Sequence, residues 1–226
     1  MEQAELLSTK LSPPHTRIAL VARPHLLARL GAGLAHSMLT LISAPPGFGK
    51  TTLLVEWLAS IQDSCSDAPQ VAWFSLDEGD NDPSRFWRYV IAACQNVQES
   101  IGTTALTLLH SPDRRALESV VTLLINDIAR LSLQCILILE DYHLIDSEQV
   151  HKSVFFLLEH LPANLHVVIA TRSDPPFPIG RFRARNVLTE VRAATLRFSS
   201  AETAAFLNDI AGCQYSTTRD RRAALA

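Results

Sequence analysis

The chain has 226 residues, of which 47% are hydrophobic and 19% are charged, and its formal net charge is −3. This length accommodates one sizeable α/β domain or a domain with a small appendage, and the composition is ordinary for a soluble globular protein. The acidic balance gives no positive field that would mark a nucleic-acid binder, and no apolar run approaches the roughly 18 residues of a membrane span. The four cysteines are scattered without a CxxC pair, so we expect buried reduced thiols in a cytoplasmic protein.

Five short apolar runs alternate with longer amphipathic segments along the chain. This alternation is typical of βαβ units on a parallel sheet, whose strands are covered on both faces and are therefore apolar at consecutive positions. The predicted strands are Met38–Ser43, Val71–Leu76, Cys135–Leu139, Leu165–Thr171 and, with a weaker pattern, Asn186–Val191. The sequence thus predicts an α/β fold, a three-layer sandwich around a five-stranded, mainly parallel sheet.

The amphipathic segments predict helices, and capping residues mark where several of them begin. The expected helices are Lys50–Ser60, one that starts near Pro83, one at about Arg115–Leu131, Ser147–Leu161, and one that opens with SSAE at residues 199–202. Asp82 is expected to cap the second helix and Asp146 the fourth, and Ser199 and Glu202 have capping-box spacing. The last helix would be an appendage beyond the sheet.

The stretch LISAPPGFGKTT, residues 41–52, joins the first predicted strand to the first predicted helix. It matches the phosphate-binding pattern G-x-x-x-x-G-K-[ST] except that Ala44 replaces the first glycine. Pro45 and Pro46 have no N–H to donate and stiffen the entry to the loop, so an alanine before them is tolerable. In this position the pattern predicts a nucleotide site rather than an ordinary turn.

A phosphate in such a loop is held by successive backbone N–H groups at the positive end of the following helix. The expected donors are Gly47, Phe48, Gly49, Lys50, Thr51 and Thr52. Gly47 and Gly49 supply backbone angles that a side chain would forbid. We expect Lys50 to reach the β- and γ-phosphates and the Thr51 hydroxyl to bind Mg²⁺.

Two carboxylates follow the third apolar run, in the stretch CILILEDYHLID. Glu140 and Asp141 stand at the carboxyl end of a buried strand, where open α/β sheets bind their ligands. Because neighbours on a strand point to opposite sides, one carboxylate can face the metal and the other an attacking water. Which of the two faces the metal stays open. Beside a phosphate-binding loop, we favour this interpretation over a solvated acidic turn.

Arg172 follows the fourth apolar run and could reach a γ-phosphate and report whether it is present. The alternative is an arginine that pairs with Asp174 on a loop. Three further arginines, Arg181, Arg183 and Arg185, are expected to form a solvated face, the alternative being an arginine supplied to a neighbouring subunit.

Taken together, these stretches resemble the nucleotide-binding domain of the MalT-like transcription regulators, large ATP-dependent activators of the LuxR type within the STAND class of ATPases, relatives of the AAA+ proteins. The resemblance runs in order through TKLSPP (9–14), VARPHLLARL (21–30), LTLISAPPGFGKTTLLVEWL (39–58), VAWFSLDEGDNDPSRFWRYVIAACQ (71–95), LILEDYHLI (137–145), VVIATRSDPPFPIGRFRAR (167–185) and LRFSSAETAAFL (196–207). It covers about residues 9 to 210.

The resemblance implies a sheet of the ASCE type with strand order 5-1-4-3-2. It divides the chain into 1–37, which contributes to the adenine pocket, 38–195, the P-loop ATPase core, and 196–226, the start of a helical lid with a truncated or divergent tail. By position, Arg23 and Pro24 would lie near the adenine and ribose, and Ala44 to Thr52 would wrap the phosphates. Thr51 and Glu140 would hold Mg²⁺.

In the same resemblance, Glu140 and Asp141 form the catalytic acidic pair and Arg172 senses the γ-phosphate, while His143 is left outside the site. The implied function is a switch: ADP holds a resting monomer, and ATP favours a form that self-associates or pairs with full-length relatives. Turnover would be slow. The sequence does not continue into the winged-helix, sensor and helix-turn-helix segments of the family, and with its slightly acidic charge this chain alone is not expected to bind DNA. The lack of a long apolar run predicts no membrane contact.

Two other functions compete with the switch. A hydrolysis-incompetent nucleotide-binding fragment would act only through contacts with full-length relatives. A small-molecule kinase would need an acceptor pocket and an arginine lid, for which GRFRAR (180–185) is the one candidate.

Overall fold

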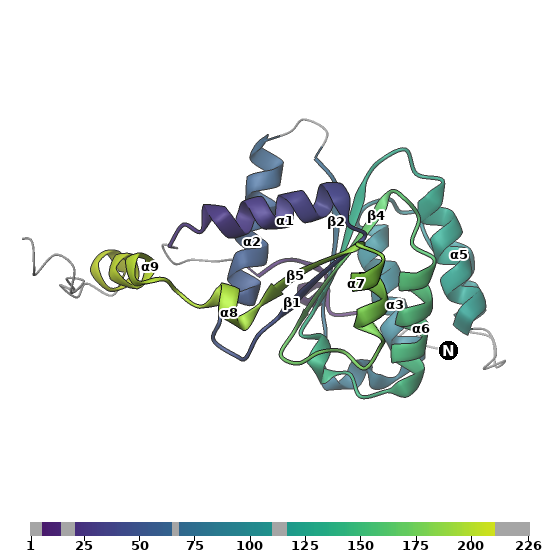
Figure 1. Ribbon diagram of the computed structural model, residues 1–226. Coiled ribbons are helices and arrows are strands. Elements are labelled where there is room, and N and C mark those ends of the chain that lie inside the picture. The colour runs from purple at the N-terminus through teal and green to yellow at the C-terminus, as the bar shows by residue number, and fades with distance from the viewer. Residues whose placement is uncertain (1–5, 15–20, 65–67, 110–116, 211–226) are drawn as a thin grey trace, which may run out of the picture.

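The protein was analysed as a computed structural model, which describes residues 6–14, 21–64, 68–109 and 117–210 (Figure 1). Its centre is a parallel sheet whose strands have the order β2-β3-β4-β1-β5. The strands are β1 Leu39–Ser43, β2 Gln70–Ser75, β3 Cys135–Glu140, β4 Leu165–Thr171 and β5 Leu188–Arg192. Read from the other edge, this is the predicted order 5-1-4-3-2, and each predicted strand is present with its ends shifted by at most two residues.

Helices cover both faces of the sheet and form the two outer layers. The α-helices that precede β5 are α1 Pro24–His36, α2 Lys50–Ser64, α3 Pro83–Gln95, α4 Thr103–Leu109, α5 Leu117–Ala129, α6 Glu148–Glu159 and α7 Ile179–Ala184. Figure 1 shows α1 and α2 on one side of the sheet and α3, α5, α6 and α7 on the other. Two separate hydrophobic clusters fill the spaces between these layers. This is the predicted three-layer α/β fold.

The pleat of the strands decides which side chains face which helices. On β3, Leu137 and Leu139 pack in the cluster of α3, α5 and α6, whereas Ile136 and Ile138 pack in the cluster of α1 and α2. Since successive strand residues alternate between faces, Glu140 follows Ile138 on the side of α2. The register places Glu140 beside Ser75, the last residue of β2. The strand pattern therefore carries a carboxylate to the side of the sheet on which α2 begins.

Short elements complete the fold, and one of them anchors the N-terminal segment. They are η1 Ser8–Leu11, η2 Glu78–Asn81, η4 Tyr142–Leu144, α8 Ala193–Leu196, α9 Ser200–Ala205 and the π-helical turn Phe206–Ile210. In η1, Lys10 is 8% exposed and its Nζ lies 2.9 Å from Asp77 Oδ2 and also contacts the fully buried Asp80. This ion network ties η1 to η2, the turn that follows the edge strand β2. In Figure 1, α9 lies apart from the sheet.

The helix starts differ in part from those expected. Asp82 caps α3 by accepting from Arg85 N, and the Ser199–Glu202 capping box is present. The expected cap by Asp146 is wrong, because Ser147 is the N-cap of α6 and makes no side-chain cap bond. Instead, Oδ1 of Asn81, from η2, accepts from the backbone N–H groups of Asp146 and Ser147.

Within the described residues, the helices α1, α4 and α7 and the single turn α8 were not expected from the pattern, and α2 runs four residues beyond the predicted end. The predicted start of α5 at Arg115 lies outside the described residues. Cys94 and Cys135 are buried free thiols, as expected, and burial raises their pKa to about 12 and about 11. Cys65 and Cys213 lie outside the described residues. Among the helices of the described ranges, none has both the length and the apolar character that a membrane crossing requires.

Candidate functional site

The glycine loop, residues 44–49, joins the carboxyl end of β1 to the first residue of α2. Gly47 and Gly49 have φ values of 80° and 74°, and a Cβ built on either would meet nothing within 4 Å. The glycines are therefore required by the backbone conformation and not by crowding. Ala44 is 2% exposed, and its N–H donates to Thr171 O at 3.2 Å. The departure from the glycine pattern thus falls at a position that continues the sheet and packs in the core.

Lys50 folds back over the glycine loop. Its Nζ donates to Ala44 O at 2.8 Å and to Pro45 O at 3.1 Å. Burial lowers the pKa of Lys50; the positive charge of Arg172 adds to this, whereas the carboxylates Asp141 and Glu140 oppose it. Glu140 ends β3, Asp141 follows it, and Arg172 follows β4. The charged groups predicted from separate motifs therefore lie at the same edge of the sheet as Lys50.

Glu140 is the carboxylate that faces α2. It is 5% exposed and ends β3. Its Oε1 accepts a hydrogen bond from the Thr51 hydroxyl, and its Oε2 accepts one from the Ser75 hydroxyl at 2.8 Å. A hydroxyl and a carboxylate side by side form the oxygen pair that Mg²⁺ uses in phosphate sites, where substrate and water supply the remaining ligands. The residues present therefore fit a magnesium ion.

Asp141 is separated from Glu140 by a backbone turn and not by the strand pleat that the sequence suggested. It lies after the end of β3 with φ 57° and ψ 35°, a left-handed conformation that aspartate tolerates better than most residues. Its side chain is 43% exposed and its Oδ1 lies 3.7 Å from His143 Nδ1. The left-handed residue turns the second carboxylate out of the sheet, toward solvent.

His143 belongs to this group, although the sequence left it out of the site. Its side chain is 10% exposed, and within the described residues neither ring nitrogen has a hydrogen-bond partner. Burial lowers the pKa of His143, and Arg172 and Lys50 add to the shift against the opposing effect of Asp141. Buried polar atoms without partners are rare in native proteins and often mark an absent ligand or water. The signal in the sequence was its position two residues after Asp141.

Arg172 follows directly after β4 and is exposed. The expected alternative, pairing with Asp174, is not what the structure has, because Asp174 contacts Arg192 at the end of β5. Over the described part of the chain, Arg172 has no ion-pair partner, and its charge acts on Lys50 and His143. Arg172 is thus a cation at the same edge of the sheet as the glycine loop.

Arg23 and Pro24 start α1. Arg23 is 6% exposed, and its guanidinium donates to the backbone oxygens of Thr195, Leu196 and Arg197 and to Glu202 Oε1. These contacts hold the segment that follows β5, and none of them reaches the glycine loop. Of the arginine cluster, Arg181 pairs with Glu159 at 3.0 Å and Arg183 with Glu190 at 2.7 Å on the surface.

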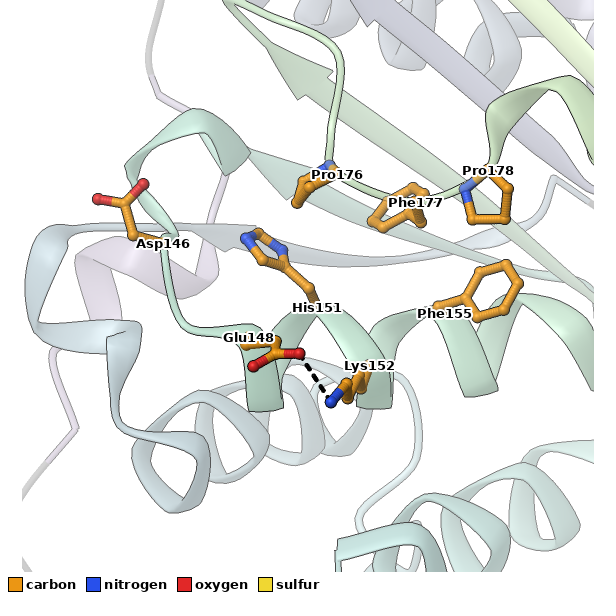
Figure 2. A pocket seen from close by; sticks show the side chains of 8 residues that line it. All are labelled: Asp146, Glu148, His151, Lys152, Phe155, Pro176, Phe177 and Pro178. Carbon is orange, nitrogen blue, oxygen red and sulfur yellow. Dashed lines mark ion pairs between the residues drawn. The ribbon is translucent and has the colours of Figure 1, made fainter.

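A separate hollow lies between α6 and the segment that follows β4 (Figure 2). Its volume is about 500 Å³, and it is lined by Asp146, Glu148, His151, Lys152, Phe155, Pro176, Phe177 and Pro178. None of the phosphate-loop residues lines it. Tyr142, which directly follows Asp141, contacts two residues that line this hollow. Its hydroxyl lies 3.0 Å from His151 Nδ1, and its ring packs on Phe177.

Comparisons with known proteins agree with this arrangement. No family model matches the chain. The HTH-type transcriptional regulators MalT of Vibrio cholerae and Vibrio parahaemolyticus are each 32% identical over 202 residues, which is 89% of this chain. The chain belongs to the family of the MalT-like regulators. It spans about a fifth of the length of these relatives, since the match covers 22% of each.

A solved structure supports the fold assignment of this MalT-like domain. The Walker-type ATPase PABY2304 of Pyrococcus abyssi superposes with a TM-score of 0.50 at 15% identity, over 84% of this chain and 57% of that one. At this identity the likeness concerns the fold alone. Together with the sheet order and the glycine loop, it identifies the P-loop NTPase architecture.

Proposed function

We propose that this MalT-like domain binds ATP or ADP with Mg²⁺ and serves as the nucleotide-dependent switch of a transcription regulator. The observation that carries the proposal is the convergence of Lys50, Thr51, Glu140 and Arg172 at the carboxyl edge of one sheet, beside a glycine loop that opens a helix. Backbone N–H groups of residues 47–52 would hold the phosphates at the positive end of α2.

The charges at the site support a phosphate ligand. Lys50 donates to two backbone oxygens of the loop, Ala44 O and Pro45 O, and a phosphate would offer it stronger, charged acceptors in their place. Mg²⁺ would be held by Thr51 and Glu140, which already contact each other. The bound ion would supply positive charge opposite the β- and γ-phosphate oxygens.

Slow hydrolysis is part of the proposal. Asp141 is partly exposed and could orient a water. The ring nitrogens of His143, which have no hydrogen-bond partner within the described residues, and the exposed guanidinium of Arg172 could contact a γ-phosphate. Since each of these contacts needs the γ-phosphate or its water, ATP and ADP would stabilise the site differently. A ligand shifts a conformational equilibrium only by such a difference in interaction between two states.

The adenine side would be formed by Arg23, Pro24 and the segment 1–37, and the lid by residues 196–226. The support is topological. Ser43, the last residue of β1 before the glycine loop, is in register with Arg192 at the end of β5. The backbone oxygens held by Arg23 follow β5 by three to five residues. Arg23 would thus join the start of α1 to the start of the lid beside the nucleotide.

Single-turnover phosphate release from ATP tests the switch, with Asp141→Asn beside Glu118→Gln, an exposed carboxylate on α5, as the control. Release by the wild-type chain and by Glu118→Gln, but not by Asp141→Asn, would support hydrolysis at this site. Self-association measured by light scattering with a non-hydrolysable ATP analogue and with ADP tests the regulatory part. Binding without release would favour the alternative, a hydrolysis-incompetent module that acts through protein contacts.

A further inference from the structure

Two side chains on β2, Trp73 and Ser75, form a hydrogen-bonded chain that ends on Glu140 Oε2, whereas Thr51 contacts Oε1. Trp73 is 1% exposed, and its indole Nε1 donates to Ser75 Oγ at 2.8 Å. Ser75 Oγ in turn donates to Glu140 Oε2 at 2.8 Å. The two residues lie two positions apart on one strand, so both side chains stand on the α2 face of the sheet with Glu140.

The direction of these hydrogen bonds is fixed by the chemistry of the groups. An indole nitrogen can only donate, so Ser75 Oγ is the acceptor in that contact. The single hydroxyl proton of Ser75 is then directed to the carboxylate of Glu140. The other carboxylate oxygen, Oε1, is left to face Thr51. Each carboxylate oxygen of Glu140 therefore has its own hydrogen-bond donor, Oε2 from β2 and Oε1 from α2.

We propose that Trp73 and Ser75 form a positioning relay that orients Glu140 for Mg²⁺. The proposal rests on the proposed function, because it assigns the Glu140 Oε1 side to the metal of a bound nucleotide. A glutamate has one more torsion than an aspartate and needs an external contact to hold its carboxylate in one orientation. Ser75 does not touch nucleotide or metal in this account, and it acts through Glu140. Such supporting contacts tune metal affinity by about 10- to 100-fold.

A second hydrogen-bonded tryptophan–serine pair, Trp87 and Ser153, provides a control for the structural effect of removing a buried serine hydroxyl. Trp87 Nε1 donates to Ser153 Oγ at 2.9 Å, and Ser153 Oγ donates to the backbone oxygen of Val150 at 2.8 Å. Trp87 and Ser153 are 0% and 3% exposed. This second indole–hydroxyl pair joins α3 to α6 on the other face of the sheet and ends on a carbonyl instead of a carboxylate. Loss of either serine hydroxyl removes a similar set of contacts, but only Ser75 affects Glu140.

The first test measures how the binding of a non-hydrolysable ATP analogue depends on Mg²⁺. In Ser75→Ala the half-saturating Mg²⁺ concentration should rise about 10-fold, whereas Ser153→Ala should leave it unchanged. Binding of the analogue in EDTA should be the same in both variants. Ser75→Thr keeps the hydroxyl and should restore the wild-type dependence on Mg²⁺. Equal Mg²⁺ dependence in Ser75→Ala and wild type would overturn the proposal.

The second test needs no nucleotide. In ¹⁵N-labelled protein the indole N–H resonance of Trp73 should shift in Glu140→Gln, because the acceptor at the end of the relay changes, while that of Trp87 should not move. An unchanged chemical shift of the Trp73 indole N–H in Glu140→Gln would show that no relay exists. If the wild-type chain does not bind the analogue at all, the proposed function fails and the metal role of Ser75 fails with it. The indole resonances then still decide whether the hydrogen-bonded chain is present.

Discussion

Lys10 offers a sharp test of how the N-terminal segment is held on the domain. Its ammonium group contacts Asp77 and the fully buried Asp80, and lies 4.3 Å from the centre of the Tyr89 ring. Lys10→Met keeps most of the apolar stem but removes the charge. The Asp80 carboxylate would then keep Arg85 Nε, at 3.1 Å, as its ion-pair partner, while remaining 0% exposed.

Removal of one partner of a buried ion pair costs about 3–5 kcal/mol, and the remaining contact with Arg85 places the expected loss at the lower end, about 3 kcal/mol. For a chain of this length, that corresponds to a fall in Tm of about 6–12 °C. Thermal and urea unfolding at neutral pH measure it, with Lys152→Met as the control, because Lys152 pairs with Glu148 where both side chains are exposed. Addition of Asp80→Asn to Lys10→Met should recover part of the loss.

The reasoning about Lys10 would be refuted if Lys10→Met and Lys152→Met lowered the free energy of unfolding equally. It would also be refuted if the added Asp80→Asn change made the protein less stable still. Either result would mean that the buried carboxylate does not depend on the lysine charge.

Three further predictions concern other parts of the fold. Gly33→Ala should destabilise the domain by about 1–3 kcal/mol in urea unfolding, because a Cβ there would meet a β5 side chain at 2.7 Å, whereas Gly31→Ala on the same helix meets nothing and should be neutral or stabilising. Arg23→Lys cannot make the same set of contacts, so backbone amides of residues 195–205 should exchange hydrogen faster than in Arg29→Lys; equal rates would contradict it. Burial lowers the pKa of His166, so its contribution to stability is present above about pH 6.5 and is lost as the pH falls below it. His166→Gln should therefore flatten the decrease of Tm between about pH 7 and 5.5, and an unchanged slope would contradict this.

Local patterns predicted the sheet well. Strands buried on both faces appear as apolar runs, and β4 was predicted with its observed bounds, Leu165–Thr171. The glycine loop was predictable because its chemistry depends on consecutive residues, and the positive φ values of Gly47 and Gly49 are confirmed. The strand order came from the family resemblance, and it too is confirmed.

What the sequence did not show depends on contacts between distant segments. Asn81 supplies the contact before α6 that Asp146 was expected to provide, from 65 positions away. The hydrogen bond between Ser75 and Glu140 joins residues that are also 65 positions apart, and neither the sequence around Ser75 nor that around Glu140 predicts it. Asp141 was expected to follow the strand pleat, but its left-handed backbone depends on the turn into η4. Helices α4 and α7 are seven and six residues long, too short for a clear amphipathic period.

The central claim is that Lys50 and the glycine loop bind a nucleotide. Isothermal titration of the purified chain with MgATP and MgADP tests it directly, with Lys50→Ala beside Lys152→Ala as a control for the loss of a lysine. We expect one binding site in the wild type and in Lys152→Ala, and an affinity at least about 10-fold weaker in Lys50→Ala, since a hydrogen bond to a charged group is lost. A folded wild-type chain without binding, or equal affinities in the two variants, would contradict the account.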